Sequence, residues 1–402
     1  MSSNLEAFYG LPNEVVFCKR CVISNQRPSS AIEFKSKKDD EKSYIGFQDG
    51  ICSACTFNET KNQKINWKDR EDRLVALLDK FRNNGRGYNV IVPGSGGKDS
   101  VYASHMLKYR YGMNPLTVTW APHLYTDVGW QNFSNWIHVG GLDNILFTPN
   151  GKLHRLLTRL AFLNLLHPFQ PFIIGQRIIG PAIAAKFGVP LVFYGENQAE
   201  YGNNIEENKS PTMDPSFFSV TNPEKMLFGG VPMEEICSKF GFTHNDFAPY
   251  IPPRPDDVSF ANIEVHYLGY YLKWDPQECY YYAVENTAFQ ANPNRTEGSY
   301  SKYSSIDDKI DPFHYYTTLV KFGIGRATYD AAQEIRNGKI TREEGVGLVR
   351  KFDQEFPQKY FPDFLNYVGI TELEFFDVIN KFRSPHLWER VGTEWKLRHQ
   401  VV

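Results

Sequence analysis

The sequence has no excess of either charge and no long apolar run. Its 402 residues include 44 Lys or Arg and 46 Asp or Glu, which gives a formal net charge of −2. This balance excludes a global positive field that would gather nucleic acid or anionic lipid. The most apolar region, residues 156–194, is interrupted by charged residues and prolines, so it lacks the roughly 18 uninterrupted apolar residues of a membrane-spanning helix. We therefore expect neither a nucleic-acid partner nor a membrane.

A secretory signal is also missing from the first residues. Residues 1–10 contain neither a basic start nor an apolar stretch followed by small residues. We therefore expect a cytoplasmic protein, and its length allows two or three domains of about 150 residues each.

Cysteine is scarce, but four of the six cysteines form two pairs with the same internal spacing. These pairs are Cys18-x-x-Cys21 and Cys52-x-x-Cys55. Two such pairs can converge on one tetrahedral ion, and four thiolates would close the coordination sphere of a structural metal. Disulfides are disfavoured by the expected compartment, and a redox-active pair by the lack of a βαβ context. We predict Zn²⁺ at these four cysteines, with iron as the open alternative.

A glycine-rich loop lies between a predicted strand and a predicted helix. Residues 88–92 indicate a short buried strand, and residues 101–109 indicate a helix. Glycines let backbone N–H groups approach an anion closely, and serines add hydroxyl donors in front of the helix N-terminus. The loop lacks the spacing of the G-x-x-x-x-G-K-[ST] motif. The predicted phosphate-binding residues are Pro93, Gly94, Ser95, Gly96, Gly97, Lys98, Asp99 and Ser100.

Three further apolar segments alternate with helical patterns. They span residues 116–120, 144–148 and 190–194. This alternation predicts an α/β fold with a doubly wound, mostly parallel sheet, in which ligands lie at the carboxyl ends of the strands. The strand-end residues expected at the same crevice as the loop are Thr119, Trp120, Glu196 and Asn197.

Asp99 is the candidate contact for a magnesium ion. Mg²⁺ prefers oxygen ligands and usually reaches a protein through one or two carboxylates while it also holds phosphates. Capping of the following helix is the alternative role for Asp99. Lys98 beside it is either a phosphate contact or a solvated lysine.

Residues 95–100, Ser-Gly-Gly-Lys-Asp-Ser, resemble the S-G-G-x-D-S signature of the PP-loop, or N-type, ATP pyrophosphatases. Members of this superfamily split ATP into AMP and pyrophosphate. They adenylate a carbonyl oxygen, which a nitrogen or sulfur nucleophile then displaces. The resemblance implies ATP and Mg²⁺ as cofactors, adenine against Thr119 and Trp120, and catalytic or magnesium-ordering groups near Glu196 and Asn197.

Five segments of the C-terminal half are informative together: residues 269–276, 297–300, 304–309, 321–328 and 334–344. They resemble the N-acetyl sugar amidotransferase family, and the paired cysteines fit the same family. The resemblance implies an ATP-dependent enzyme of bacterial surface-glycan or nonulosonic-acid biosynthesis. Such an enzyme adenylates the N-acetyl carbonyl oxygen of a nucleotide-linked sugar, and ammonia then displaces AMP to leave an acetamidino group.

Lys309 and Arg326 complete the predicted catalytic set with Asp99, as cations that contact phosphates. Each is alternatively a solvated surface charge, because most charged residues are exposed. Residue two is Ser2 and no glycine-flanked nucleophilic cysteine is present, so we expect no glutaminase activity in this chain. The resemblance therefore implies a partner glutaminase that supplies ammonia, with or without a cyclase-like protein that conducts it.

Three regions are predicted along the chain. Residues 1–62 form a four-cysteine zinc-binding module, residues 63–215 the PP-loop core, and residues 216–402 a substrate-binding, mainly helical region. Within the last region, residues 341–356 and 371–382 are predicted amphipathic helices with threonine caps.

Two other functions compete with the amidotransferase. A PP-loop tRNA-modifying enzyme, a thiolase or a lysidine-type synthetase, is disfavoured because no Lys/Arg-rich stretch provides a basic surface. A non-catalytic ATP-binding scaffold is disfavoured by the intact loop at residues 95–100.

Overall fold

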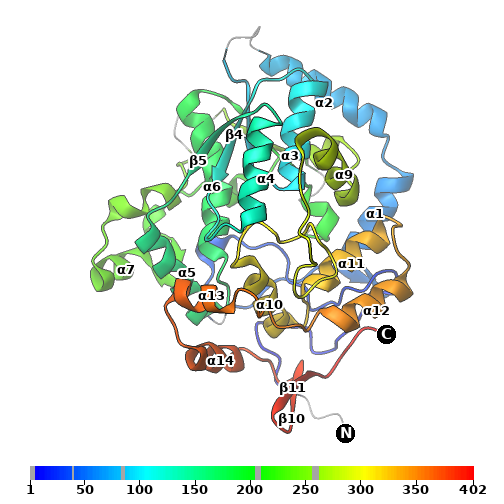
Figure 1. Ribbon diagram of the computed structural model, residues 1–402, viewed down its shortest axis with the longest axis vertical. Helices are drawn as coiled ribbons and strands as arrows, with labels where there is room; N and C mark the ends of the chain where they lie inside the picture. Colours follow the sequence, from blue (N-terminus) through cyan, green and yellow to red (C-terminus); the bar gives the residue numbers. More distant parts are fainter. Residues whose placement is uncertain (1–4, 39, 83–86, 204–209, 256–261) are drawn as a thin grey trace.

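The centre of the protein is a five-stranded sheet, seen in a computed structural model (Figure 1). The strand order is β5-β4-β3-β6-β9, and every neighbouring pair is parallel. The strands are β3 (Val90–Pro93), β4 (Pro115–Trp120), β5 (Asp143–Phe147), β6 (Leu191–Tyr194) and β9 (Glu264–Tyr267). The structure describes residues 5–38, 40–82, 87–203, 210–255 and 262–402.

Helices cover both faces of the sheet. The chain runs from β3 to β4 and β5 at one edge and then returns to place β6 on the other side of β3. Right-handed crossovers therefore put α3 (Lys98–His105) and α4 (Asp127–His138) on one face, and α5 (Gly151–Leu165) and α6 (Gln170–Phe187) on the other. The strand order reverses between β3 and β6, where ligands bind in such sheets. The predicted doubly wound α/β class is confirmed.

The four predicted strands are confirmed, with ends that shift by one or two residues. The fifth strand, β9, was not predicted and comes from beyond the proposed boundary at residue 215. Its four residues, Glu-Val-His-Tyr, are too few to show an apolar period. The three predicted regions stay a prediction, although the sheet extends across the second boundary.

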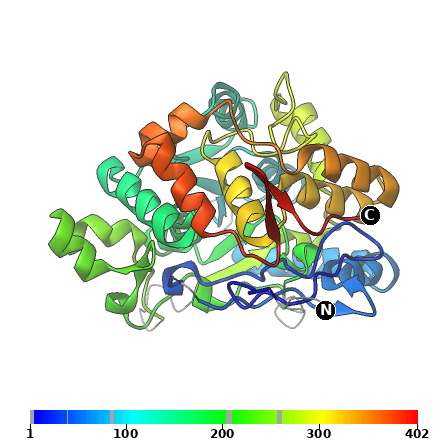
Figure 2. The ribbon, with the colours of Figure 1, turned by 90° about the horizontal axis from the view of Figure 1, so that it is seen from below.

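The C-terminal region is mainly helical and lies against the carboxyl ends of the strands (Figures 1 and 2). The backbone N–H of Thr126, which follows β4, donates to Asp307 O at 3.1 Å. The helices predicted at residues 341–356 and 371–382 are present, and capping boxes begin both of them. The helices here are α10 (Asp311–Phe322), α11 (Arg326–Arg336), α12 (Arg342–Phe352), α13 (Phe361–Val368) and α14 (Glu372–Lys381).

The remaining elements surround this framework. The other helices are α1 (Ser53–Gln63), α2 (Trp67–Phe81), α7 (Met233–Phe240), α8 (Leu268–Tyr271) and α9 (Pro276–Thr287). Short hairpins pair β1 (Phe47–Gln48) with β2 (Ile51–Cys52), β7 (Leu227–Phe228) with β8 (Val231–Pro232), and β10 (Trp388–Val391) with β11 (Glu394–Leu397). Within the described residues, no helix has the length and apolar character to cross a membrane.

The four paired cysteines belong to a hydrophobic cluster of their own. This cluster includes Ala331 and Ala332 of α11 and Val401 near the C-terminus. The predicted N-terminal module is therefore covered by the last part of the chain. Ser2 lies outside the described residues.

Candidate active site and metal centre

Glycines allow the phosphate loop to fold tightly between β3 and α3. A Cβ atom at Gly94 would lie 2.1 Å from Ser100 Cβ. Gly96 has φ +84°, and a Cβ atom there would lie 2.8 Å from Phe133 Cα in α4. Larger residues at these two positions would therefore push the loop away from the start of α3 and from α4.

The N-terminus of α3 has backbone N–H groups that can bind an anion. Gly97 is the N-cap residue, and no side chain caps it. Ser100 Oγ donates instead to Gly97 O at 2.9 Å. The N–H groups of the first helical turn and the helix dipole therefore favour a negatively charged ligand at the loop.

A cleft of ≈ 530 Å³ opens beside this loop, at the reversal point between β3 and β6. Seven predicted residues line it: Pro93, Gly94, Ser95, Gly97, Asp99, Ser100 and Glu196. Arg177 of α6 lines the cleft as well and was not predicted. An arginine inside the apolar region 156–194 was the signal that could have found it.

Asp99 has the chemistry of a magnesium contact. Its Oδ2 atom lies 2.5 Å from Lys98 Nζ, whereas its Oδ1 atom is buried without a hydrogen-bond partner. Burial lowers the pKa of Lys98, but the negative charges of Asp99 and Glu196 outweigh it, so this pKa is raised and the lysine stays charged. An unpartnered carboxylate oxygen beside the loop fits an oxygen-seeking cation.

A second cavity of ≈ 200 Å³ lies on the other side of Asp99. Asp99, Glu196 and Tyr201 line both cavities. The rest of the second cavity is formed mainly by tyrosines, hydroxyl side chains and charged residues from α9, α10, α11 and the segment before α10. These include Asp275, Ser301, Tyr303, Ser304, Tyr315, Arg326, Tyr329, Asp330, Glu334 and Lys339.

Glu196 stands where the two cavities meet. Tyr201 donates its hydroxyl hydrogen to Glu196 Oε2. Burial raises the pKa of Glu196, and the nearby charge of Asp99 raises it further. A carboxylate between two cavities, with a proton affinity above its ordinary value, is a candidate for proton transfer.

The predicted catalytic set is only partly brought together. Arg326 begins α11 and lines the second cavity, where its Nε atom lies 3.1 Å from Asp330 Oδ1. Lys309 pairs instead with Asp363 at 3.0 Å and lines neither cavity. Asp99 and Arg326 thus share one cavity, and Lys309 lies apart from them.

The predicted strand-end residues other than Glu196 have buried side chains. Thr119 and Trp120 are 0% and 2% exposed, and a Cβ atom at Gly175 of α6 would lie 2.2 Å from the Trp120 ring. Asn197 caps the short helix η3 (Gln198–Tyr201) by accepting from Ala199 N at 3.2 Å. These three residues line neither cavity. An adenine contact at β4 stays a prediction, with no side-chain surface offered there by Thr119 or Trp120.

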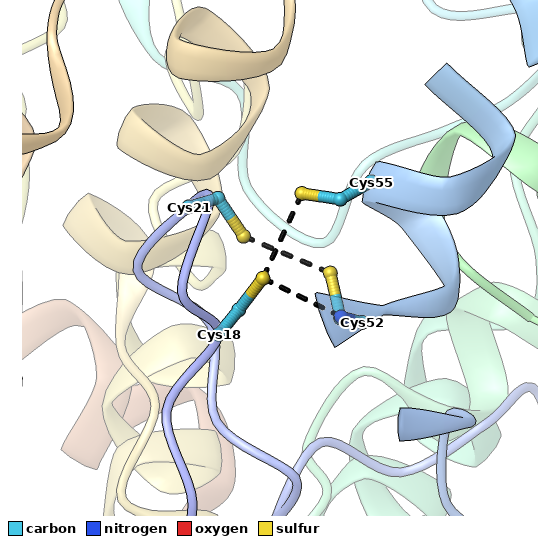
Figure 3. Close-up of side chains that lie close together, drawn as sticks. All are labelled: Cys18, Cys21, Cys52 and Cys55. Carbon is cyan, nitrogen blue, oxygen red and sulfur yellow. Dashed lines mark hydrogen bonds between the residues drawn. The ribbon is translucent and has the colours of Figure 1, made fainter. Parts of the chain in front are cut away.

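The four paired cysteines converge in the structure (Figure 3). All four sulfur atoms lie within 4.8 Å of one another, and two pairs are 3.8 Å and 3.7 Å apart. A disulfide needs about 2.05 Å, whereas a tetrahedron of thiolates at a Zn–S distance of about 2.3 Å has edges of about 3.8 Å. The backbone N–H groups of Arg20 and Cys52 each point to Cys18 Sγ at 3.4 Å. The predicted convergence of Cys18, Cys21, Cys52 and Cys55 is therefore confirmed, and the site fits one tetrahedral ion.

Two buried cations connect this cysteine site to the second cavity. Lys61 of α1 forms a 2.7 Å ion pair with Glu200, next to Tyr201. The Arg27 guanidinium lies 5.7 Å from the Tyr201 ring centroid and 5.4 Å from that of Tyr329. The N-terminal region thus supports one wall of the second cavity. No local motif marks either cation, so the sequence did not predict them.

The C-terminal part of the chain has a recognisable relative. Residues 297–401 match the family model described as "LPS biosynthesis protein WbpG-like, C-terminal domain". These residues include Ser301, Tyr315 and Arg326 of the second cavity. No curated protein matches the chain.

Solved structures offer only distant likenesses. An NMN synthetase from Francisella tularensis has 15% identity and a TM-score of 0.26, over 33% of this chain and 56% of its own. An NH3-dependent NAD synthetase from Campylobacter jejuni has 14% identity and a TM-score of 0.27, over 34% of this chain and 59% of its own. The U34-tRNA thiolase NcsA from Methanococcus maripaludis, with its [4Fe-4S] cluster, has 13% identity and a TM-score of 0.31, over 81% of this chain and 86% of its own. This chain thus spans little more than half of the length of each synthetase.

Proposed function

We propose that this protein is an ATP-dependent amidotransferase that adenylates the N-acetyl carbonyl oxygen of a nucleotide-linked sugar and replaces that oxygen with ammonia. The observation that carries the proposal is the shared wall of the two cavities, formed by Asp99, Glu196 and Tyr201. A phosphate site and an acceptor site must meet in this way for an oxygen of one ligand to reach the α-phosphorus of the other.

ATP would occupy the cleft beside the phosphate loop. The first turn of α3 and the guanidinium of Arg177 would face its phosphates. Mg²⁺ would be held by Asp99 together with those phosphates, and it would neutralise charge that develops on pyrophosphate.

The second cavity has the chemistry of a sugar site. Its hydroxyl and tyrosine side chains suit a polyhydroxylated ring. Its cations are already paired: Lys339 lies 3.3 Å from Asp275 and 2.9 Å from Glu278, and Arg326 lies beside Asp330. An uncharged acetamido sugar moiety fits such a cavity better than a diphosphate does, because paired cations have little left to offer a second anion.

The reaction would proceed in two halves. In the first, the acetamide oxygen attacks the α-phosphorus of ATP, the bond to the β-phosphate oxygen breaks, and pyrophosphate leaves. In the second, ammonia adds to the imidate carbon, the C–O bond breaks, and AMP leaves with that electron pair. Positioning of the two ligands supplies much of the rate enhancement.

The WbpG-like match supports a role in lipopolysaccharide biosynthesis, because the matched residues contribute much of the second cavity. We propose a structural Zn²⁺ at the cysteine site, since the sulfur separations correspond to one ion. We also propose that a separate glutaminase subunit supplies the ammonia.

The test is incubation of the purified protein with ATP, Mg²⁺, ammonium and a series of UDP-linked acetamido sugars. We expect AMP and pyrophosphate in equal amounts, together with a sugar whose mass changes by the replacement of O with NH. Formation of ADP, or no turnover with any acetamido sugar, would contradict the proposal. Retention and modification of tRNA by the purified protein would favour the tRNA-modifying alternative.

A further inference from the structure

Glu196 lies where the cleft beside the phosphate loop meets the second cavity. Three of the described residues line both cavities, and their side chains make different contacts. Asp99 is held by Lys98 through one oxygen and has its other oxygen buried. Tyr201 donates its hydroxyl to Glu196. Glu196 alone of the three combines a carboxylate, a place at the junction and an orienting hydroxyl donor.

We propose that Glu196 is the proton acceptor for the nitrogen nucleophile in the second half of the reaction. This inference rests on the proposed function, because it assigns a role within the same two-cavity site. The role is separate from adenylation, in which the attacking amide oxygen carries no proton to be removed.

Atoms and charges balance in this step. The nitrogen lone pair of ammonia forms a bond to the imidate carbon, which leaves a positively charged NH3 group on a tetrahedral carbon. One N–H proton passes to the carboxylate of Glu196. The C–O bond then breaks, its electron pair stays on the oxygen of AMP, and the sugar keeps an acetamidinium group.

The charges around Glu196 favour this role. Burial and the charge of Asp99 raise its pKa, and Glu200 acts in the same direction. Lys98 from α3 and Arg326 from α11 act in the opposite direction but do not reverse the shift. A base of raised pKa takes a proton from nitrogen more readily than an ordinary carboxylate does.

Other carboxylates are less suitable. Glu334 lines the second cavity only, and it accepts a hydrogen bond from Tyr300 at 2.8 Å. Asp330 accepts from Ser299 and pairs with Arg326. Neither lines the cleft, where AMP would be bound when nitrogen attacks.

The experiment separates the two half-reactions in wild type and in Glu196→Gln. Adenylation is followed without ammonia, as exchange of labelled pyrophosphate into ATP that depends on the acetamido sugar. Amidine formation is followed with ammonium present. We expect Glu196→Gln to retain most of the exchange and to lose about 100-fold or more of amidine formation, the usual contribution of a general base. Glu235→Gln, in an exposed pair with Lys239 on α7, is the matched control and should change neither rate.

Two further measurements strengthen the test. With hydroxylamine as nucleophile the loss should shrink, because its adduct gives up a proton more easily than that of ammonia. Glu196→Asp moves the carboxylate by one methylene and should show the same separation of half-reactions, so the test remains available if the glutamine variant unfolds. Tyr201→Phe should weaken amidine formation less than Glu196→Gln does, because it removes only the orienting hydroxyl.

The outcomes distinguish this inference from the proposed function. An equal loss of exchange and amidine formation in Glu196→Gln would overturn the proton-acceptor role and leave the amidotransferase intact. Absence of sugar-dependent exchange in the wild type would overturn both.

Discussion

The two cavities that meet at Glu196 are built in different ways. The cleft takes its anion-binding groups from the loop at residues 93–100 and from the backbone of α3. The second cavity is built from side chains of segments that are far apart in the sequence, and its charges are mostly paired. A site made from backbone is encoded by glycine spacing, whereas a site made from paired side chains depends on the whole fold. Substitutions in the cleft and in the second cavity should therefore have different effects.

The largest expected effect is in the loop. Gly96→Ala places a Cβ atom at positive φ and 2.8 Å from the backbone of Phe133. Backbone strain of about 1–3 kcal/mol together with this clash should displace the loop and weaken ATP binding about 100-fold. Calorimetric titration with ATP measures the effect. Gly347→Ala, in a position on α12 with open space around it, is the control and should bind ATP normally. Unchanged affinity in Gly96→Ala would show that the loop does not hold the phosphates.

The second effect is a loss of metal from the cysteine site, with ATP binding in the cleft unchanged. Cys55→Ser is expected to reduce the metal content from about one zinc ion per chain and to lower the midpoint of thermal unfolding. ATP binding should persist as long as the chain is folded, because the cysteines line neither cavity. Elemental analysis and thermal melts measure these effects, and Cys237→Ser on α7 is the matched control. Iron in place of zinc, with visible absorbance, would contradict the proposed ion.

The third effect should fall on the second cavity alone. Arg326→Lys keeps the charge but loses the planar group that lies beside Asp330 and the Tyr315 ring. We expect KM for the acceptor to rise about tenfold while the Kd for ATP stays unchanged. The comparison variant is Lys309→Met, which should have little effect because Lys309 pairs with Asp363 outside both cavities. If Lys309→Met is the more damaging of the two, Lys309 acts in catalysis after all.

The smallest effect concerns the stability of the fold outside both cavities. Glu33 forms an ion pair with His167 at 3.2 Å. Burial alone would raise the pKa of Glu33, but the charges of His167 and Arg177 lower it to about 2. Because this pKa is depressed, the stabilisation is present above the ordinary value of 4.5 and is lost as the pH falls from there towards 2. Glu33→Gln should cost about 2 kcal/mol of unfolding free energy at pH 5.5 and much less at pH 3, because the pair needs both an ionised carboxylate and a protonated imidazole. Urea unfolding at both values checks this, and an equal difference at the two would exclude the pair as its source.

The sequence predicts the features that local residues encode, and it misses those that depend on contacts between distant residues. The β3–loop–α3 unit was predicted because its glycines are local, and the parallel sheet was predicted because strands and helices alternate. Glu196 was predicted from the rule that ligands lie at strand ends. Arg27 and Lys61 were missed, because a buried cation is recognised only when its distant partners are known. Trp120 was expected at the ligand because it ends a strand, but its ring packs against Gly175 in the core.

The cysteine site is buried by residues from the C-terminal part of the chain, and this affects the order in which the parts of the protein fold. In a chain synthesised from its N-terminus, the four cysteines emerge long before Ala331, Ala332 and Val401, which bury them. A metal ion captured early would therefore remain accessible until the last helices dock. The contact between Arg27 and Tyr329 of α11 would form only then, so the second cavity would be the last part of the molecule to be completed.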